Sequence, residues 1–184
     1  MTDPLFISSV IHIAAIGCGT VGALTDLRSR RIPNWLTGPA MLLGVVLHLL
    51  AGGWKGGASA LFALLLCGAV FLVFFLAGGM GAGDVKLIAA EASLLGLSSS
   101  GSLLLYTVLC GGVLGLGLAI QRGKLRNTLA NVLRLTLHHG RNGLQPHPEL
   151  NVLNQSTLRL PYGVAIALGC LLTLCLQPTT GLPL

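Results

Sequence analysis

Acidic side chains are scarce in this sequence, and the positions of three of them suggest chemistry. The chain has 184 residues, of which five are Asp or Glu. Asp3 is near the N-terminus, and Glu149 lies in a polar segment. Asp26, Asp84 and Glu91 lie at or within long apolar runs. Ionisable groups in apolar surroundings are costly and are usually retained for function, so these three are the first candidates for a site.

Two carboxyl groups in one place can hydrolyse a peptide bond. Carboxyls that lie close together cannot both ionise easily, so one keeps a proton and the pair titrates as a unit. The ionised partner takes a proton from an attacking water, while the protonated partner polarises the carbonyl oxygen. We predict that Asp26 and Asp84 form such a pair, with no metal and no cofactor.

The residues around Asp84 have two interpretations. Gly81 and Gly83 lack Cβ atoms, so an extended substrate could approach Asp84 closely; a flexible loop or close helix packing explains the same glycines. Asp84 could also cap the start of a helix. Lys86 is on a different helical face, where it could set the local potential or reach the membrane interface.

Asp26 and Glu91 also have structural alternatives. Asp26 could pair with Arg28 or Arg30 at the end of a span, and Arg28 could instead orient a substrate or hold anionic lipid. Glu91 lies two helical turns after Asp84, about 10 Å away along the helix. It could form an interhelical hydrogen bond, for example to Thr107, or tune the catalytic pair or line a water path.

Long apolar runs must position these acids. Of all residues, 53% are hydrophobic and 9% are charged, whereas soluble domains have about 25% charged residues. Five runs without Asp, Glu, Lys or Arg are each long enough for a membrane span, which needs roughly 20 residues: Pro4–Thr25, Ile32–Trp54, Gly56–Gly83, Ala92–Gln121 and Leu160–Leu184. We predict an all-α integral membrane protein.

Glycine-rich and polar breaks divide these runs into about six transmembrane helices. The predicted spans are Pro4–Thr25, Asn34–Leu50, Ala58–Ala77, Asp84–Leu97, Leu103–Ile120 and Leu158–Leu176. The breaks that separate the middle four are Gly52–Gly57, Gly78–Gly83 and Ser98–Ser102. The whole chain, 1–184, is then a single membrane-embedded domain.

Basic residues predict the orientation. They crowd the first loop, as Arg28, Arg30 and Arg31, and the fifth loop, within 121–157. Cytoplasmic loops carry such an excess, so loops one, three and five should be cytoplasmic and both termini periplasmic. Span counting then brings Asp26 and Asp84 to the same depth. The same pattern explains the net charge of +6 without nucleic acid.

The fifth loop, 121–157, is the longest polar segment. Leu125, Leu129, Val132, Leu133 and Leu137 recur at helical spacing. They predict an amphipathic cytoplasmic helix that lies either on the lipid surface or on the protein itself. His138, His139 and His147 match no familiar metal site, and the five cysteines form no Cys-x-x-Cys pair.

Three segments resemble the type IV prepilin peptidases. Gly81-Ala82-Gly83-Asp84-Val85-Lys86 resembles the Gly-x-Gly-Asp motif of that family, and the segment from Asp26 to Pro33-Asn34 resembles its other aspartate motif. The segment from Leu160 to Ala165 resembles its last span. The motifs follow in the family's order over nearly the whole chain.

The resemblance implies that Asp26 and Asp84 are catalytic, within motifs that include Gly81, Gly83, Lys86, Arg28, Pro33 and Asn34. It implies a prepilin or pseudopilin substrate whose short basic leader is cut after a glycine. It also implies the bacterial inner membrane, lipids and a pilus or secretion machinery as surroundings. The chain lacks the family's N-terminal region with paired Cys-x-x-Cys motifs, which is linked to methylation. It is similar to the short form found with Flp-type pili, so we expect no methyltransferase domain.

Two other classes of function are compatible with the acids. A small proton- or cation-coupled transporter could use Asp26, Asp84 and Glu91 as a relay. However, a relay places carboxylates at several depths, and the sequence shows no convincing inverted repeat. A noncatalytic subunit of a pilus machine is the second alternative, against which the retained aspartates argue.

Overall fold

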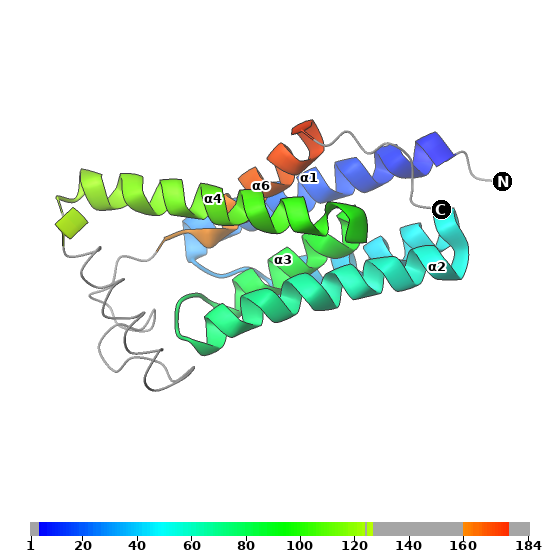
Figure 1. Ribbon diagram of the computed structural model, residues 1–184, viewed down its shortest axis with the longest axis horizontal. Coiled ribbons are helices and arrows are strands. Elements are labelled where there is room, and N and C mark those ends of the chain that lie inside the picture. The colour runs from blue at the N-terminus through cyan, green and yellow to red at the C-terminus, as the bar shows by residue number, and fades with distance from the viewer. Residues whose placement is uncertain (1–3, 124, 127–159, 177–184) are drawn as a thin grey trace.

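The computed structural model describes residues 4–123, 125–126 and 160–176, and all regular structure in these residues is helical. The helices are α1 (Pro4–Ser29), α2 (Asn34–Leu76), α3 (Ala82–Leu95), α4 (Leu97–Gln121) and α6 (Tyr162–Leu176). They pack side by side as an elongated bundle (Figure 1). The predicted all-α fold is confirmed, whereas the predicted loop helix within 121–157 lies almost entirely outside the described residues.

The helix α2 is broken into two limbs at a glycine pair. Gly52 and Gly53 have non-helical dihedrals, with φ −119° and ψ 15° at the first and φ 60° and ψ −152° at the second. A Cβ on Gly56 would overlap the carbonyl oxygen of His48, although eight residues of a straight helix span about 12 Å. The chain therefore turns back sharply, and Figure 1 shows the two limbs side by side. The break predicted at Gly52–Gly57 is confirmed, but only its first two residues leave the helical conformation.

Three of the described helices are long and apolar enough to cross a membrane. They are Phe6–Ser29, Asn34–Leu76 and Leu97–Gln121, and Tyr162–Leu176 is a shorter apolar helix. Large apolar side chains cover their outer faces, among them Ile13, Leu42 and Val113. A surface of this kind suits lipid rather than water. The chain is a membrane protein. That it has six spans stays a prediction.

The turn predicted at Ser98–Ser102 is wrong. The chain reverses at a single residue, Gly96, whose φ of 79° lies in the left-handed region that favours glycine. The helix α4 begins at the next residue and includes the serines. Ser100 Oγ donates a hydrogen bond to the Gly96 carbonyl at 3.0 Å, so the serine hydroxyls are accommodated inside the first turn. The fifth predicted span is therefore longer than expected.

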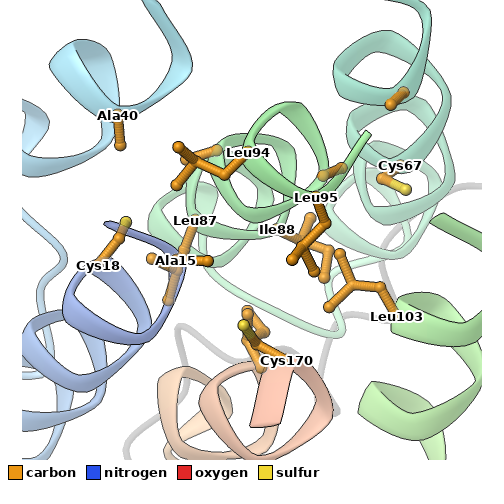
Figure 2. Packing of buried hydrophobic residues seen from close by; sticks show 14 of the residues in the cluster. Ala15, Cys18, Ala40, Cys67, Leu87, Ile88, Leu94, Leu95, Leu103 and Cys170 are labelled. Carbon is orange, nitrogen blue, oxygen red and sulfur yellow. The ribbon is translucent and has the colours of Figure 1, made fainter. Parts of the chain in front are cut away.

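The short helix α3 forms the centre of the molecule. Every residue from Leu87 to Leu95 is buried, and α3 contacts α1, α2, α4 and α6. Figure 2 shows α3 surrounded by side chains from the other helices, including Ala40, Cys67, Leu103 and Cys170. From Leu87 onward, α3 is therefore a core helix enclosed by its neighbours on every side.

Small residues let the neighbouring helices approach α3 closely. A Cβ on Gly22 of α1 would lie 2.8 Å from the Leu87 side chain, and a Cβ on Gly44 of α2 would overlap Ser93. Packing through small residues is the usual means of association between helices in a membrane. His48 Nε2 donates to the Leu94 carbonyl at 3.0 Å and so supports the C-terminal end of α3.

The helix ends that carry the two aspartates lie at one end of the bundle. In Figure 1 the end of α1, the start of α3 and the start of α6 gather on the left. The α2 glycine turn and the α3–α4 reversal lie at the opposite end. The expectation that Asp26 and Asp84 share one depth therefore agrees with the path of the chain.

Candidate active site

Asp26 lies in the last turn of α1, which continues to Ser29, four residues beyond the predicted end of the span at Thr25. Its Oδ2 accepts a hydrogen bond from the Gly163 N–H at 2.8 Å, across 137 positions of sequence. Gly163 opens α6, so the positive end of that helix faces the carboxylate. A Cβ at position 163 would lie 2.9 Å from Asp26 Cβ, which explains why the residue is glycine.

The turn that follows Asp26 adds a positive charge. Arg30 has φ 53°, an unusual conformation for a residue with a side chain, and its N–H donates to the Asp26 carbonyl at 2.8 Å. Its guanidinium interacts electrostatically with the Asp26 carboxylate. Of the two arginines considered from the sequence, Arg30 is therefore the partner of Asp26. Arg28 is exposed in the last turn of α1.

Asp84 lies in the first turn of α3. Its Oδ2 accepts a hydrogen bond from the Gly81 N–H at 3.0 Å, which satisfies one of the unpaired donors at the helix start. The predicted helix-capping role is therefore present, although Asp84 is the third residue of the helix and Gly81 occupies the N-cap position. Asp26 and Asp84 are each 9% exposed, so both carboxyls lie at the edge of the buried region.

The two carboxyls lie within electrostatic range of each other, with the charge of Asp26 acting on Asp84. Tyr162, the residue before Gly163, also interacts electrostatically with Asp84. The start of α6 therefore bonds to Asp26 and lies within electrostatic range of Asp84. Two carboxyls so placed share a proton more easily than they carry two charges, as acid–base hydrolysis requires.

The motif glycines are packed against the protein itself. A Cβ on Gly81 would lie 3.3 Å from Asp84 Oδ2, and one on Gly83 would lie 3.2 Å from Ile32 Cβ. The absence of side chains thus lets the first turn of α3 fit against the loop after Asp26. The role of these glycines in substrate approach stays a prediction.

The other motif residues lie beside the pair. Pro33 precedes α2, and Asn34 is the first residue of that helix. Lys86 Nζ donates a hydrogen bond to Asn34 Oδ1 at 2.9 Å, so the two aspartate motifs touch each other. Within the described residues, no group of three or more His, Cys, Asp or Glu side chains could hold a metal ion. His138, His139 and His147 lie outside those residues.

Glu91 is isolated in the core. It is 0% exposed, and neither carboxyl oxygen has a hydrogen-bond partner of good geometry. Its polar neighbours are the thiols of Cys18 in α1 and Cys170 in α6, which are weak donors. The hydrogen bond suggested to Thr107 is absent. Thr107 packs against Gly169, and its own hydroxyl also lacks a partner.

Sequence reasoning assigned no role to two residues near the pair. Gly163 donates a hydrogen bond to Asp26, and Tyr162 interacts electrostatically with Asp84. The sequence identifies the segment from Leu160 to Ala165 only through its family resemblance. The single local signal for Gly163 is its place just after Pro161, where a helix can begin. Nothing in the sequence says which side chain that helix start faces.

Comparison with known proteins identifies the family. The model of the type IV leader peptidase family matches residues 13–116, more than half of the chain. The match includes Asp26 and Asp84 and ends before α6. The chain matches none of the curated proteins and none of the solved structures with which it was compared. Because the family model spans more than half of the chain and both aspartates, the chain belongs to the type IV leader peptidase family.

Proposed function

We propose that the protein is an aspartic endopeptidase of the bacterial inner membrane that removes the short basic leader from prepilin-like substrates. The family implies a peptidase with prepilin-type substrates. The observation that carries the aspartic mechanism is that Asp26 and Asp84, which are 58 positions apart in sequence, lie within electrostatic range of each other. Both carboxyls are supported by backbone N–H groups at one end of the bundle.

The surroundings of the two acids suggest their roles. Asp26 receives the Gly163 N–H and faces Arg30, both of which favour its ionised form. Asp84 faces the negative charge of Asp26, and its other principal partner among the described residues is the Gly81 N–H rather than a cation. Asp26 is therefore the general base, and Asp84 is the acid that polarises the scissile carbonyl.

Hydrolysis then needs only these two groups and water. Asp26 takes a proton from water as the water oxygen bonds to the carbonyl carbon, and Asp84 gives its proton to the carbonyl oxygen. The resulting tetrahedral diol collapses when the amide nitrogen receives the proton held by Asp26 and the C–N bond breaks. Asp84 recovers a proton from the diol, so both carboxyls return to their starting states.

The transporter alternative is not favoured by the packing. A proton relay needs acidic groups linked by hydrogen bonds or water along the pathway. Leu87, which lies one turn after Asp84 and is fully buried, packs against Gly22 between the aspartates and Glu91. Glu91 has no hydrogen bond toward the pair. The three acids therefore form two separate environments.

The decisive experiment uses the purified protein in detergent with a prepilin-like substrate that has a basic leader, a glycine and then a hydrophobic helix. Mass spectrometry should find a single cut after the glycine and a free amine on the new N-terminus, since we propose no methyltransferase activity. A substrate with the glycine replaced by leucine is the matched control. The endopeptidase proposal fails if the intact protein leaves the substrate uncut, and the single-activity proposal fails if a methyl group appears with added S-adenosylmethionine.

A further inference from the structure

Two exposed side chains are joined next to the aspartate pair. Lys86 Nζ donates to Asn34 Oδ1 at 2.9 Å, although the residues are 52 positions apart. Both residues are exposed. A solvent-exposed contact of this kind contributes little to global stability, because water competes for both groups and the long side chain loses conformational freedom. Stability alone is therefore a poor explanation for it.

The position of the contact is more informative than its strength. Asn34 begins α2, directly after the connection 30–33 that leaves the Asp26 turn. Lys86 lies two residues after Asp84 in α3. The hydrogen bond therefore joins the segment that carries one aspartate to the segment that carries the other. Beside it, the Cα of Gly83 packs closely against Ile32, so the two segments meet at two neighbouring points.

The connection between α1 and α2 needs such external support. Arg30 is held at φ 53°, which is unfavourable for a residue with a Cβ. Within the connection, Ser29 Oγ reaches the Arg31 carbonyl only at 3.3 Å. A strained residue persists when its surroundings hold it in place. The contacts of Ile32 and Asn34 with α3 are the ones that hold this connection against the Asp84 turn.

We propose that the Lys86–Asn34 hydrogen bond is a clamp that sets the spacing between Asp26 and Asp84. Lys86 and Asn34 are then positioning residues for hydrolysis and do not bind substrate. Asp26 is fixed on one side by Gly163 of α6, and the clamp fixes its helix end relative to α3. Catalytic groups must be held within about 0.5 Å, and a misplacement of 1 Å can cost about 100-fold in rate. This inference rests on the proposed endopeptidase function.

The test is a double-mutant cycle on full-length protein, with the cleavage assay as readout. Lys86→Met keeps the aliphatic stem and removes the donor, while Asn34→Ala removes the acceptor. We expect each to lower kcat by roughly tenfold or more with little change in KM. The double variant should be no worse than either single variant, because one bond is lost in all three. Lys55→Met, an exposed lysine at the other end of the bundle, should match wild type.

A rescue separates the clamp from other roles. Exchanging the two residues, Asn34→Lys with Lys86→Asn, restores a donor and an acceptor in reverse order and should recover most of kcat. Asn34→Asp keeps an acceptor and should remain near wild type.

Three results would overturn the clamp while wild type still cleaves. In the first, Asn34→Ala stays fully active while Lys86→Met raises KM, which would make Lys86 a substrate ligand. In the second, the single losses multiply in the double variant. In the third, kcat falls only together with the unfolding temperature. A wild-type protein that cleaves nothing would instead refute the proposed function.

Discussion

At the scale of single residues, each aspartate is oriented by a backbone N–H rather than by another side chain. Gly163 holds Asp26 and Gly81 holds Asp84, in both cases through Oδ2. Backbone donors at helix starts are rigid, so the carboxyls are oriented before substrate arrives. A carboxyl held through one oxygen can use its second oxygen for water or for the scissile carbonyl.

Replacing either acid by its amide should abolish hydrolysis. Asp26→Asn and Asp84→Asn preserve size and still offer an oxygen to the Gly163 or Gly81 N–H, so the helices should keep their places. An amide cannot act as a carboxylate base or pass on a proton. We expect turnover to fall by at least about 100-fold in each variant, measured by cleavage of a prepilin-like substrate. Membrane insertion, measured in parallel, should be normal, and near-normal turnover in either variant would contradict the paired-acid mechanism.

Glu91 should be dispensable for the chemistry. Its carboxyl lies among Cys18, Gly19 and Cys170, away from the pair. Leu87 separates it from Asp84 along α3. Glu91→Gln keeps the shape of the side chain, so we expect appreciable cleavage with an unchanged dependence of rate on pH. Activity as low as that of Asp84→Asn, in a protein that still inserts and folds, would place Glu91 in the mechanism.

At the scale of helices, the site depends on how closely α6 approaches α1. The start of α6 supplies the Gly163 N–H to Asp26 and carries Tyr162 beside Asp84. This geometry exists only because position 163 has no side chain. The distance between two helices thus controls the orientation of the Asp26 carboxyl.

Gly163→Ala should separate the two helices and lower activity. The added Cβ would lie 2.9 Å from Asp26 Cβ and 3.1 Å from the Gly22 carbonyl, so α6 must shift and the hydrogen bond to Asp26 must lengthen. We expect a loss of stability of about 1–3 kcal/mol and a fall in kcat of roughly tenfold to 100-fold. Thermal unfolding and cleavage measure the two effects.

Gly112→Ala is the matched control for this change. Gly112 lies within α4, and a Cβ there would meet nothing within 4 Å. Because alanine favours helix more than glycine does, this variant should be unchanged or slightly more stable. Equal losses in the two variants would show that the effect comes from helix composition and not from the contact with Asp26.

Local signals in the sequence predicted the breaks between helices better than they predicted the contacts between helices. The glycine pair at Gly52 and Gly53 announces a turn through its own backbone freedom. The serines at 98–102 led to the wrong prediction of a turn. Hydroxyl side chains are typical of turns, but they can also be satisfied within a helix, as Ser100 shows. Apolar runs reveal that helices exist but give little sign of which face meets which neighbour.

The candidate site shows the same limit. Both aspartates could be proposed from the sequence, because acids are conspicuous in apolar runs. The backbone N–H of Gly163 could not, because a backbone donor has no signature in side-chain chemistry and its acceptor is 137 positions away. The suggested partner of Glu91, Thr107, failed for a related reason: spacing along one helix does not specify what the next helix presents.

At the scale of the whole molecule, charge and site share one end of the bundle. Exposed Arg28, Arg30 and Arg31 follow Asp26, and exposed Arg122 follows α4, which ends at the same side (Figure 1). The opposite end contributes Lys55 beside the glycine turn. An excess of basic residues is typical of the cytoplasmic side, so the active site should open toward the cytoplasm.

Topology reporters can test this orientation directly. A reporter fused within Gly140–Gln155 should be active only in the cytoplasm, and reporters placed after Leu184 or beside Lys55 should be active only in the periplasm. The reason is the asymmetry of basic residues between the two ends of the bundle, which determines how short loops partition across the membrane. The Lys55 fusion is the internal control, because the fold places that turn opposite the aspartates whatever the orientation. A cytoplasmic signal at Lys55 together with a periplasmic signal from the long loop would show that the orientation is the reverse of the predicted one. Asp26 and Asp84 would then face the periplasm, where a leader retained in the cytoplasm could not reach them.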